Sequence, residues 1–458
     1  MDWVPTISDR GGPLYLRIVN ALSDDIAAGR LHQGQLLPTH RTLAAALGVD
    51  LTTVTRAYTE ARRQGLTDAR VGRGTFVKAG AAQQGRQTVS PGIDLSMNLP
   101  PQPQDADLTG RLAKTFGEVR ADPGLESYLN YQQPGGTRAE RNTAADWLQI
   151  LVPGITSDRL IIAPGTQSAL FCLLLTLTSP GDSIFTEALS YPGLKGAAAA
   201  LGVSLIGVEM DADGIVPGAL ERACRRHSEV KVVYLMPTMH NPTTATMPAS
   251  RRAQIAQIVR KGSLTLIEDD PYAFLTSGVA PLTTLIPERA YLTASLSKSL
   301  TPGLRASLVV VPDQGDAARL ISSLRATVQM PVPLAVAIVT RWMRDGTATA
   351  IIKAVSAEAA ARQKLARDAL AGQTYAADPK GLHVWLSLPE TRSSVRFAAQ
   401  LQKRGLGVVT GDAFATTQPP PNCIRIALGA ARNRPMLVKA LEILRETLGA
   451  KGYDEQVV

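Results

Sequence analysis

The stretch Ser295-Leu296-Ser297-Lys298-Ser299-Leu300-Thr301-Pro302-Gly303-Leu304-Arg305 decides how the larger part of this chain is interpreted. Lys298 stands between small hydroxyl side chains, and a Pro-Gly turn leads on to Arg305. A lysine amine condenses with an aldehyde, while hydroxyls and a guanidinium hold a phosphate. The stretch therefore predicts a buried site for an aldehyde cofactor that carries a phosphate.

Short apolar runs alternate with helical patterns on both sides of this stretch, from about residue 93 onward. Continuous apolar runs bounded by turns are typical of strands that are buried on both faces. The runs that predict strands are 160–163, 183–186, 203–208, 231–236, 264–268, 291–294 and 307–311. Helical patterns between most of them predict a mainly parallel sheet covered on both faces, and mixed elements beyond about residue 345 predict a smaller lobe.

Polar residues also stand at the ends of earlier predicted strands. The motifs are Gly165-Thr166-Gln167-Ser168, Ser190-Tyr191-Pro192-Gly193, His240-Asn241-Pro242-Thr243 and Glu268-Asp269-Asp270-Pro271-Tyr272. Each motif alone is an ordinary turn or helix cap. Ligands of open α/β sheets bind at the carboxyl ends of parallel strands, so we expect these side chains to meet there. A helix that starts at Thr166 suits a phosphate, and a carboxylate such as Asp269 suits a protonated ring nitrogen.

The first 78 residues show a different pattern, with apolar residues at helical spacing from Leu14 to Ile26. Further helices are predicted at 41–47 and 51–64, and two short strands at 66–70 and 75–77. This order predicts a winged helix-turn-helix over residues 12–78, followed by a linker over 79–92. The residues that suit contacts with DNA bases and phosphates are Arg41, Thr52, Thr53, Arg56, Gly72, Arg73 and Gly74. The alternative is a small three-helix interaction domain.

The composition fits a soluble protein of several domains, with 458 residues, 45% hydrophobic and 19% charged. The formal net charge of +9 favours polyanionic partners without proving one. Cys172, Cys224 and Cys423 lie far apart, which predicts reduced thiols and no metal site. The first residues lack the pattern of a secretory signal, and the apolar run 169–177 is too short to cross a bilayer. We therefore expect a cytoplasmic protein with no membrane partner.

The residues from Leu37-Pro38-Thr39-His40-Arg41-Thr42-Leu43-Ala44 to Gly72-Arg73-Gly74-Thr75-Phe76-Val77 resemble the GntR-type DNA-binding domain. The resemblance implies that a double-stranded DNA operator is a partner. Regulators of this type often carry arginines where this chain has Leu51 and Thr55. This difference leaves the operator sequence open.

The strand-end motifs, taken in order, resemble the fold-type I aminotransferases over residues 93–450, and the whole chain is similar to the MocR/GabR subfamily of GntR-type regulators. The resemblance implies a winged helix-turn-helix joined to an α/β aminotransferase-like domain that binds pyridoxal 5′-phosphate. It implies that Lys298 forms the internal aldimine with this cofactor and that Asp269 pairs with its pyridine nitrogen.

The same resemblance implies how the cofactor is held. The residues are Asn241 and Tyr272 at the ring oxygen, Tyr191 against the ring face, and Thr166, Gln167, Ser295, Ser297 and Arg305 at the phosphate. Tyr131 is implied to reach the phosphate of a partner subunit, which makes the protein a homodimer.

Arg425 matches the arginine that grips a substrate α-carboxylate in this family, and its alternative is a surface arginine on a strand. Two departures from the pattern leave residual catalysis open. Thr244 stands where a glycine is common, and Glu268-Asp269-Asp270-Pro271-Tyr272 is closer to true aminotransferases than to the regulators.

These features predict a pyridoxal-phosphate-dependent transcriptional regulator that senses an amino-acid-like amine through an external aldimine at Lys298. One alternative is an active aminotransferase with an attached DNA-binding domain. Another is a sensor of pyridoxal phosphate itself that controls vitamin B6 supply. The sequence leaves the effector, the target genes and the sign of regulation open.

Overall fold

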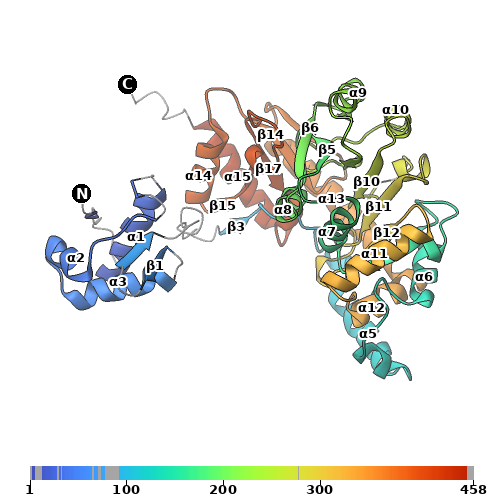
Figure 1. Ribbon diagram of the computed structural model, residues 1–458, viewed down its shortest axis with the longest axis horizontal. Helices are drawn as coiled ribbons and strands as arrows, with labels where there is room; N and C mark the ends of the chain where they lie inside the picture. Colours follow the sequence, from blue (N-terminus) through green and yellow to red (C-terminus); the bar gives the residue numbers. More distant parts are fainter. Residues whose placement is uncertain are drawn as a thin grey trace. The chain divides into compact units, whose positions relative to one another are not determined.

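A computed structural model of the chain describes residues 3–5, 13–27, 30–31, 34–63, 66–70, 74–77, 92–276 and 278–450. The predictions for Gly72, Arg73 and most of the 79–92 linker lie outside these residues. The chain divides into two compact units, residues 1–90 and 91–458 (Figure 1).

The smaller unit contains three helices and a hairpin in its described part. They are α1 Leu14–Ala27, α2 His40–Leu47, α3 Leu51–Arg63, and the antiparallel pair β1 Thr67–Arg70 and β2 Gly74–Val77. Thr39 caps α2 because its hydroxyl oxygen accepts from the Thr42 N–H at 3.2 Å, and Gly48, with φ of 63°, ends that helix. This order confirms the predicted winged helix-turn-helix.

The core of this unit forms where apolar side chains recur at helical spacing. Ile18, Leu22, Leu43, Val54 and Ala61 are each at most 1% exposed. These side chains come from all three helices, so the hydrophobic pattern that predicted the helices also packs them together.

The larger unit is built on a seven-stranded sheet with the order β4-β12-β11-β10-β9-β5-β6. The strands are β4 Leu160–Ala163, β5 Ser183–Glu187, β6 Ser204–Val208, β9 Val232–Leu235, β10 Thr265–Asp270, β11 Ala290–Ser295 and β12 Ser307–Val310. All seven predicted runs form these strands, with ends shifted by up to two residues. The sheet is parallel except for β12, which is antiparallel to β11 and β4. The connection from β11 to β12, residues 296–306, contains the single turn η5 Pro302–Leu304 but no crossover α-helix.

Successive residues of the central strands enter two separate cores. In β9, Val232 and Tyr234 pack into one core, while Val233 and Leu235 pack into the other. Side chains alternate across a strand, so a strand covered on both faces is apolar throughout. The helices that accompany the sheet are α7 Thr166–Leu177, α8 Pro192–Ala200, α9 Pro217–Arg226, α10 Ala249–Lys261 and α11 Gln314–Thr327 (Figure 1). The predicted cover on both faces is confirmed.

Further helices and short elements complete the large unit. The helices are α5 Leu108–Arg120, α6 Arg138–Leu148, α12 Pro333–Arg344 and the long α13 Thr347–Ala369. The single-turn helices are η1 Gln104–Ala106, η2 Leu125–Leu129, η3 Ser157–Arg159, η4 Leu282–Thr284, η5 Pro302–Leu304, η6 Gly411–Ala413 and η7 Leu428–Ala430. A small hairpin joins β7 Met210–Asp211 to β8 Gly214–Ile215.

The smaller lobe carries its own four-stranded sheet, in the order β13-β14-β17-β16. It consists of β13 Tyr375–Ala377, β14 His383–Ser387, β16 Val409–Thr410, β17 Cys423–Ala427, α14 Ser394–Lys403 and α15 Arg434–Gly449. β3, Ile93–Asp94, also belongs to it, because it pairs in parallel with β15, Leu406–Gly407. The expectation that this lobe begins beyond residue 345 is therefore incomplete.

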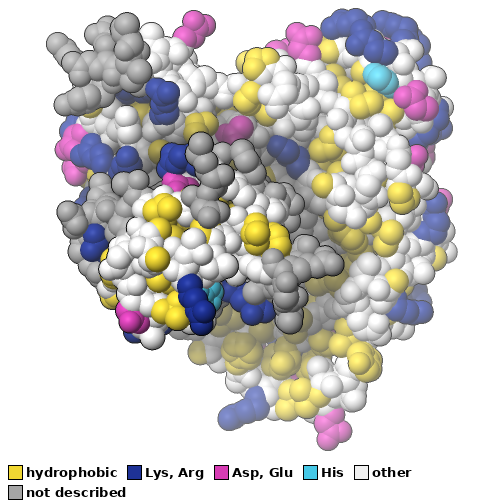
Figure 2. Space-filling view, turned by 60° about the vertical axis from the view of Figure 1, so that its left-hand side comes forward, with side chains coloured by type: hydrophobic (Ala, Val, Ile, Leu, Met, Phe, Trp, Pro, Cys, Tyr) yellow, Lys and Arg dark blue, Asp and Glu magenta, His cyan; other side chains and the backbone are white. Residues whose placement is uncertain are grey.

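Lys and Arg side chains are dispersed over the face shown in Figure 2, with one group over the end of the larger unit that carries α9. Helix α9 ends in Arg225 and Arg226. Several of the charges near α9 are paired, as Arg222 is with Glu209 at 3.4 Å. Positive charge is thus a property of both units. None of the described helices combines the length and the apolar character that crossing a membrane requires.

Candidate functional site

A cavity of about 390 Å³ lies in the larger unit beside the carboxyl ends of β10 and β11. It brings together nearly all of the side chains that the sequence singled out in this unit. Those that line it are Thr166, Gln167, Tyr191, Asn241, Asp269, Tyr272, Ser295, Ser297, Lys298, Arg305 and Arg425. Residues 97–99, which the sequence did not single out, also line it.

Lys298 enters this cavity three residues after the end of β11. Burial, and then the nearby Arg425 guanidinium, lower the pKa of the Lys298 amine to about 8, although Asp269 acts in the opposite direction. The amine donates a hydrogen bond to the backbone oxygen of Asn98. An amine with such a pKa is partly neutral near pH 7 and is able to attack an aldehyde.

Asp269 lies on β10 and is held by hydroxyl groups from the two neighbouring strands. Its carboxylate accepts from the Tyr234 hydroxyl at 2.7 Å and from the Thr293 hydroxyl at 2.7 Å. Burial raises the pKa of Asp269, while these two donors oppose that effect. A carboxylate held in this way can stabilise a protonated ring nitrogen.

The glycine turn before α7 packs against Arg305. Gly165 has φ of 87°, and a Cβ at this position would lie 2.5 Å from Arg305 Nη2. No side chain caps the first turn of α7, so its N–H groups suit an anion. The Thr166 hydroxyl donates to Ser307 Oγ at 3.2 Å, and the Gln167 amide donates to the Gly193 carbonyl at 2.9 Å. In this arrangement the backbone N–H groups at the start of α7 would face a phosphate bound there.

Arg425 lies on β17 and is 6% exposed, which excludes the alternative of a surface arginine. Its Nη1 donates to Asn241 Oδ1 at 2.8 Å, and its Nη2 donates to the backbone oxygen of Ser96. The guanidinium lies over the Phe414 ring at 5.0 Å. Because a guanidinium only donates, Asn241 turns its oxygen toward Arg425 and leaves its NH₂ group for other acceptors.

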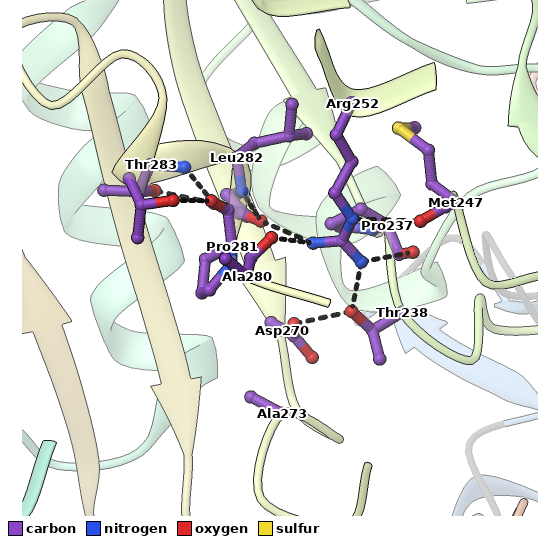
Figure 3. A network of polar contacts seen from close by, with 12 residues as sticks. Pro237, Thr238, Met247, Arg252, Asp270, Ala273, Ala280, Pro281, Leu282 and Thr283 are labelled. Carbon is purple, nitrogen blue, oxygen red and sulfur yellow. Dashed lines mark hydrogen bonds and ion pairs between the residues drawn. The ribbon is translucent and has the colours of Figure 1, made fainter. Parts of the chain in front are cut away.

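A buried polar network supports the carboxyl ends of β9 and β10 (Figure 3). Arg252 donates to the Pro237 carbonyl at 3.0 Å and to Thr238 Oγ1 at 2.9 Å, and it lies 3.6 Å from Glu268. Thr238 in turn donates to Asp270 at 2.7 Å. Arg252 on α10 thereby connects the loop after β9 to the end of β10, the two segments that carry Asn241 and Asp269.

The candidate DNA contacts lie in the smaller unit. Arg41 is exposed, and the exposed Thr52 donates its hydroxyl to the capping carboxylate of Asp50. Arg56 is exposed and lies over the Tyr15 ring at 4.7 Å, which braces α3 against α1. Thr53 is half-buried. Gly74 begins β2 with φ of 102°.

Tyr131 does not line the cavity; it is 83% exposed in the single chain. Sequence reasoning missed several residues that contact the site or support it: Asn98, Tyr234, Arg252, Thr293 and His383. For two of them the sequence holds a signal, a polar residue inside an apolar run: Tyr234 in β9 and His383 in β14.

The side chains in the cavity form a donor set for one kind of group. Lys298 offers an amine for an aldehyde, Asp269 a carboxylate for a ring nitrogen, and Asn241 and Tyr272 donors for a ring oxygen. The uncapped start of α7 with Arg305 suits a phosphate. This set fits pyridoxal 5′-phosphate. Among the described residues, no group of His, Cys, Asp and Glu side chains is able to hold a metal ion.

Two family models match this chain. The model for aminotransferase class I and II matches residues 90–444, and the model for bacterial regulatory proteins of the gntR family matches residues 14–77. An archaeal alanine:glyoxylate aminotransferase structure superposes with a TM-score of 0.73 at 24% identity, over 79% of this chain and 91% of that one, which shows the fold.

Curated relatives cover both units together. The HTH-type transcriptional regulator YdeF of Bacillus subtilis is 30% identical over 98% of this chain and 97% of its own length. The vitamin B6 salvage pathway transcriptional repressor PtsJ of Salmonella typhimurium is 28% identical over 93% of this chain and 96% of its own length. The chain therefore belongs to the transcriptional regulators of MocR/GabR type, in which a GntR-family DNA-binding domain is joined to an aminotransferase class I and II domain whose cofactor is pyridoxal 5′-phosphate.

Proposed function

We propose that this regulator responds to an amino-acid-like amine, which takes the place of Lys298 on the cofactor aldehyde. The observation that carries the proposal is that Lys298 and Arg425 line the same cavity. One suits exchange with an incoming amine, and the other suits a carboxylate gripped by two donors.

The backbone around Asn98 supports this pairing. Lys298 donates to the Asn98 oxygen, and Arg425 donates to the Ser96 oxygen. Two cations that bind carbonyls two residues apart lie close together, so one small molecule with an amine and an acid is able to reach both. In the proposal, the effector replaces these contacts and the domain closes around it. Closure changes how the two DNA-binding units of a homodimer fit paired half-sites. The effector shifts the equilibrium between open and closed states only by the difference between its affinities for the two.

The test is a titration of cofactor-loaded protein with α-amino acids, ω-amino acids and aminosulfonates, which follows the visible cofactor band. The same amines are added to the protein on a DNA duplex selected from a random pool. An amine that shifts the band should change DNA affinity, and Lys298→Ala should abolish both responses. Lys439→Ala, an exposed lysine on α15, is the matched control. A Lys298→Ala protein that still responds on DNA would refute the proposal.

A second candidate is a regulator that senses pyridoxal phosphate itself. It is favoured by the likeness to PtsJ, whose name assigns it to vitamin B6 salvage. DNA affinity measured with and without the cofactor, and with no amine present, distinguishes the two. A change on adding the cofactor alone supports the second candidate.

A third candidate is an active aminotransferase. It is favoured because Asp269, Lys298 and Arg425 all line the cavity. Sustained turnover of amino donors and 2-oxo acids at roughly 1–1000 per second would support it, whereas a single half-reaction supports the sensor.

A further inference from the structure

Three buried polar side chains form a row of hydrogen bonds beside the cavity. His383 lies on β14, Asn98 follows β3, and Tyr272 follows β10; they are 0%, 7% and 1% exposed. Asn98 Nδ2 lies 2.7 Å from the Tyr272 hydroxyl and 3.2 Å from His383 Nδ1. Three separate segments of the chain meet in this row, so its hydrogens must be shared consistently.

The direction of each hydrogen bond follows from the partner of His383, which lies at one end of the row. His383 Nε2 lies 3.1 Å from the Pro242 carbonyl, which only accepts, so Nε2 carries the hydrogen. In a neutral imidazole the other nitrogen, Nδ1, is then an acceptor. Asn98 must face Nδ1 with its NH₂ group, and the second hydrogen of that group goes to the Tyr272 oxygen.

His383 keeps this arrangement over a wide pH range. Burial, and then Arg425, lower the pKa of His383 to about 3, whereas the Pro242 and His240 carbonyls oppose the shift. The charged or titratable groups that surround the imidazole are Arg425, His240 and Tyr272. Burial also raises the pKa of Tyr272. Both side chains are therefore neutral near pH 7, and the hydrogens do not reverse.

The consequence falls on Tyr272. Its oxygen receives a hydrogen from Asn98, so its own hydrogen needs another acceptor. In the part of the chain that the structure describes, no group accepts a hydrogen bond from this hydroxyl. Tyr272 lines the same cavity as Lys298. Its hydrogen is directed into the cavity.

We propose that His383 and Asn98 are positioning residues, which fix Tyr272 as a hydrogen-bond donor to the ring oxygen of the cofactor. This rests on the proposed function only in that Lys298 carries the cofactor. The row selects the donor state of Tyr272, because a tyrosine without the Asn98 hydrogen is free to rotate and to accept instead.

The test is the pH midpoint of the visible band of cofactor-loaded protein. A hydrogen bond donated to the ring oxygen stabilises the negative charge on that oxygen. The oxygen then attracts the proton on the Lys298 nitrogen less strongly, so the pH midpoint of the visible band falls. Tyr272→Phe should raise the midpoint. Asn98→Ala and His383→Leu should raise it in the same direction by about half a unit or more, which is roughly a threefold change in proton affinity. His383→Asn keeps a neutral acceptor in place of Nδ1 and should stay near the parent value.

A double-mutant comparison separates positioning from general damage. In a Tyr272→Phe background, Asn98→Ala and His383→Leu should shift the midpoint no further. An unchanged midpoint in the single variants, or an equal shift in that background, overturns the inference. If His383→Leu does not fold, Asn98→Ala decides alone. The absence of any visible band in the unaltered protein would instead overturn the proposed function, and this inference with it.

Discussion

Lys298 differs from an ordinary lysine through its surroundings. An exposed lysine amine is almost fully protonated near pH 7, but burial beside Arg425 lowers the pKa of this one to about 8. Charge repulsion and lost hydration act together, and Asp269 compensates only in part. The neutral amine, which is the nucleophile, is therefore available under mild conditions.

This pKa predicts how the apoprotein captures its cofactor. The rate at which the visible band forms should rise with pH through a midpoint near 8, not near 10.5. The measurement is stopped-flow absorbance at several pH values with excess pyridoxal phosphate. Lys298→Arg retains a positive charge without a usable nucleophile and should form no band. A midpoint near 10 in the unaltered protein would contradict the lowered pKa.

Asp270 predicts a dependence of stability on pH. Burial raises the pKa of Asp270 to about 7 from its ordinary 3.8, so the folded protein binds its proton more tightly than the unfolded chain does. The contribution of Asp270 to the free energy of unfolding is therefore highest below about pH 4 and falls as pH rises to about 7. Asp270→Asn should remove this fall. From about pH 4 to about pH 7, the free energy of unfolding of the variant should therefore rise relative to that of the parent by up to about 4 kcal/mol, at about 1.4 kcal/mol for each pKa unit.

Urea unfolding at about pH 5 and about pH 8 measures this difference. Asp122→Asn is the control without this dependence, because hydrogen bonding to Gly124 and Arg341 lowers the pKa of Asp122, so this carboxyl is ionised in the folded and the unfolded chain at both pH values. Its variant should lose the same free energy of unfolding at about pH 5 and about pH 8. Equal pH dependence in the parent protein and Asp270→Asn would contradict the role assigned to burial.

The start of α7 shows how an element creates a binding site. Gly165→Ala would place a Cβ 2.5 Å from Arg305 and force a side chain into φ of 87°. We expect cofactor affinity to fall at least about tenfold, because the arginine must move away from the phosphate end. Gly154→Ala is the matched control: its φ is 78°, but its Cβ would meet nothing within 4 Å. The control should lose about 1–2 kcal/mol of stability and no affinity. If both variants lose the same affinity, backbone strain alone explains the loss, and the contact with Arg305 does not.

Helix α3 gives a prediction for DNA binding. Arg56 is held over Tyr15 at 4.7 Å and is preordered for a phosphate or base contact. Arg56→Ala should weaken binding to a random-sequence duplex and reduce the slope of log affinity against log salt by about 1. Arg222→Ala, in the larger unit, should leave both unchanged. If Arg56→Ala leaves the slope of log affinity against log salt unaltered, Arg56 does not contact the DNA phosphates.

The elements also show what the sequence was able to predict. Strands such as β9 were found because both of its faces are buried, which makes the run continuously apolar. The two-residue strand β3 was missed because so short a segment has no period, and only its pairing with β15 creates it. Asn98 and His383 were missed for a related reason. Their role depends on a contact between positions 285 residues apart, which no local pattern records.

Exposed apolar side chains lie around Tyr131 on the surface of the larger unit. The Gln132 N–H contacts Met330 Sδ at 3.0 Å, which places segment 129–132 beside 328–332. Leu129, Tyr131 and Val332 are 73%, 83% and 56% exposed. Grouped apolar side chains of this kind mark interaction surfaces. They support the proposed homodimer, in which Tyr131 serves the phosphate of the partner subunit.

Mixing two defective chains tests that arrangement. Lys298→Ala removes the cofactor linkage, and Tyr131→Phe should weaken cofactor binding about tenfold or more, because a hydrogen bond to a charged group is lost. If Tyr131 acts across the interface, a mixed dimer contains one site with both Lys298 and a tyrosine from the other chain. About a quarter of all sites should then bind tightly, since about half of the dimers are mixed and one of their two sites is intact. Borohydride labelling of Lys298 at limiting cofactor counts these sites. If Tyr131 acts within its own chain, no mixture contains an intact site, and tight labelling stays absent.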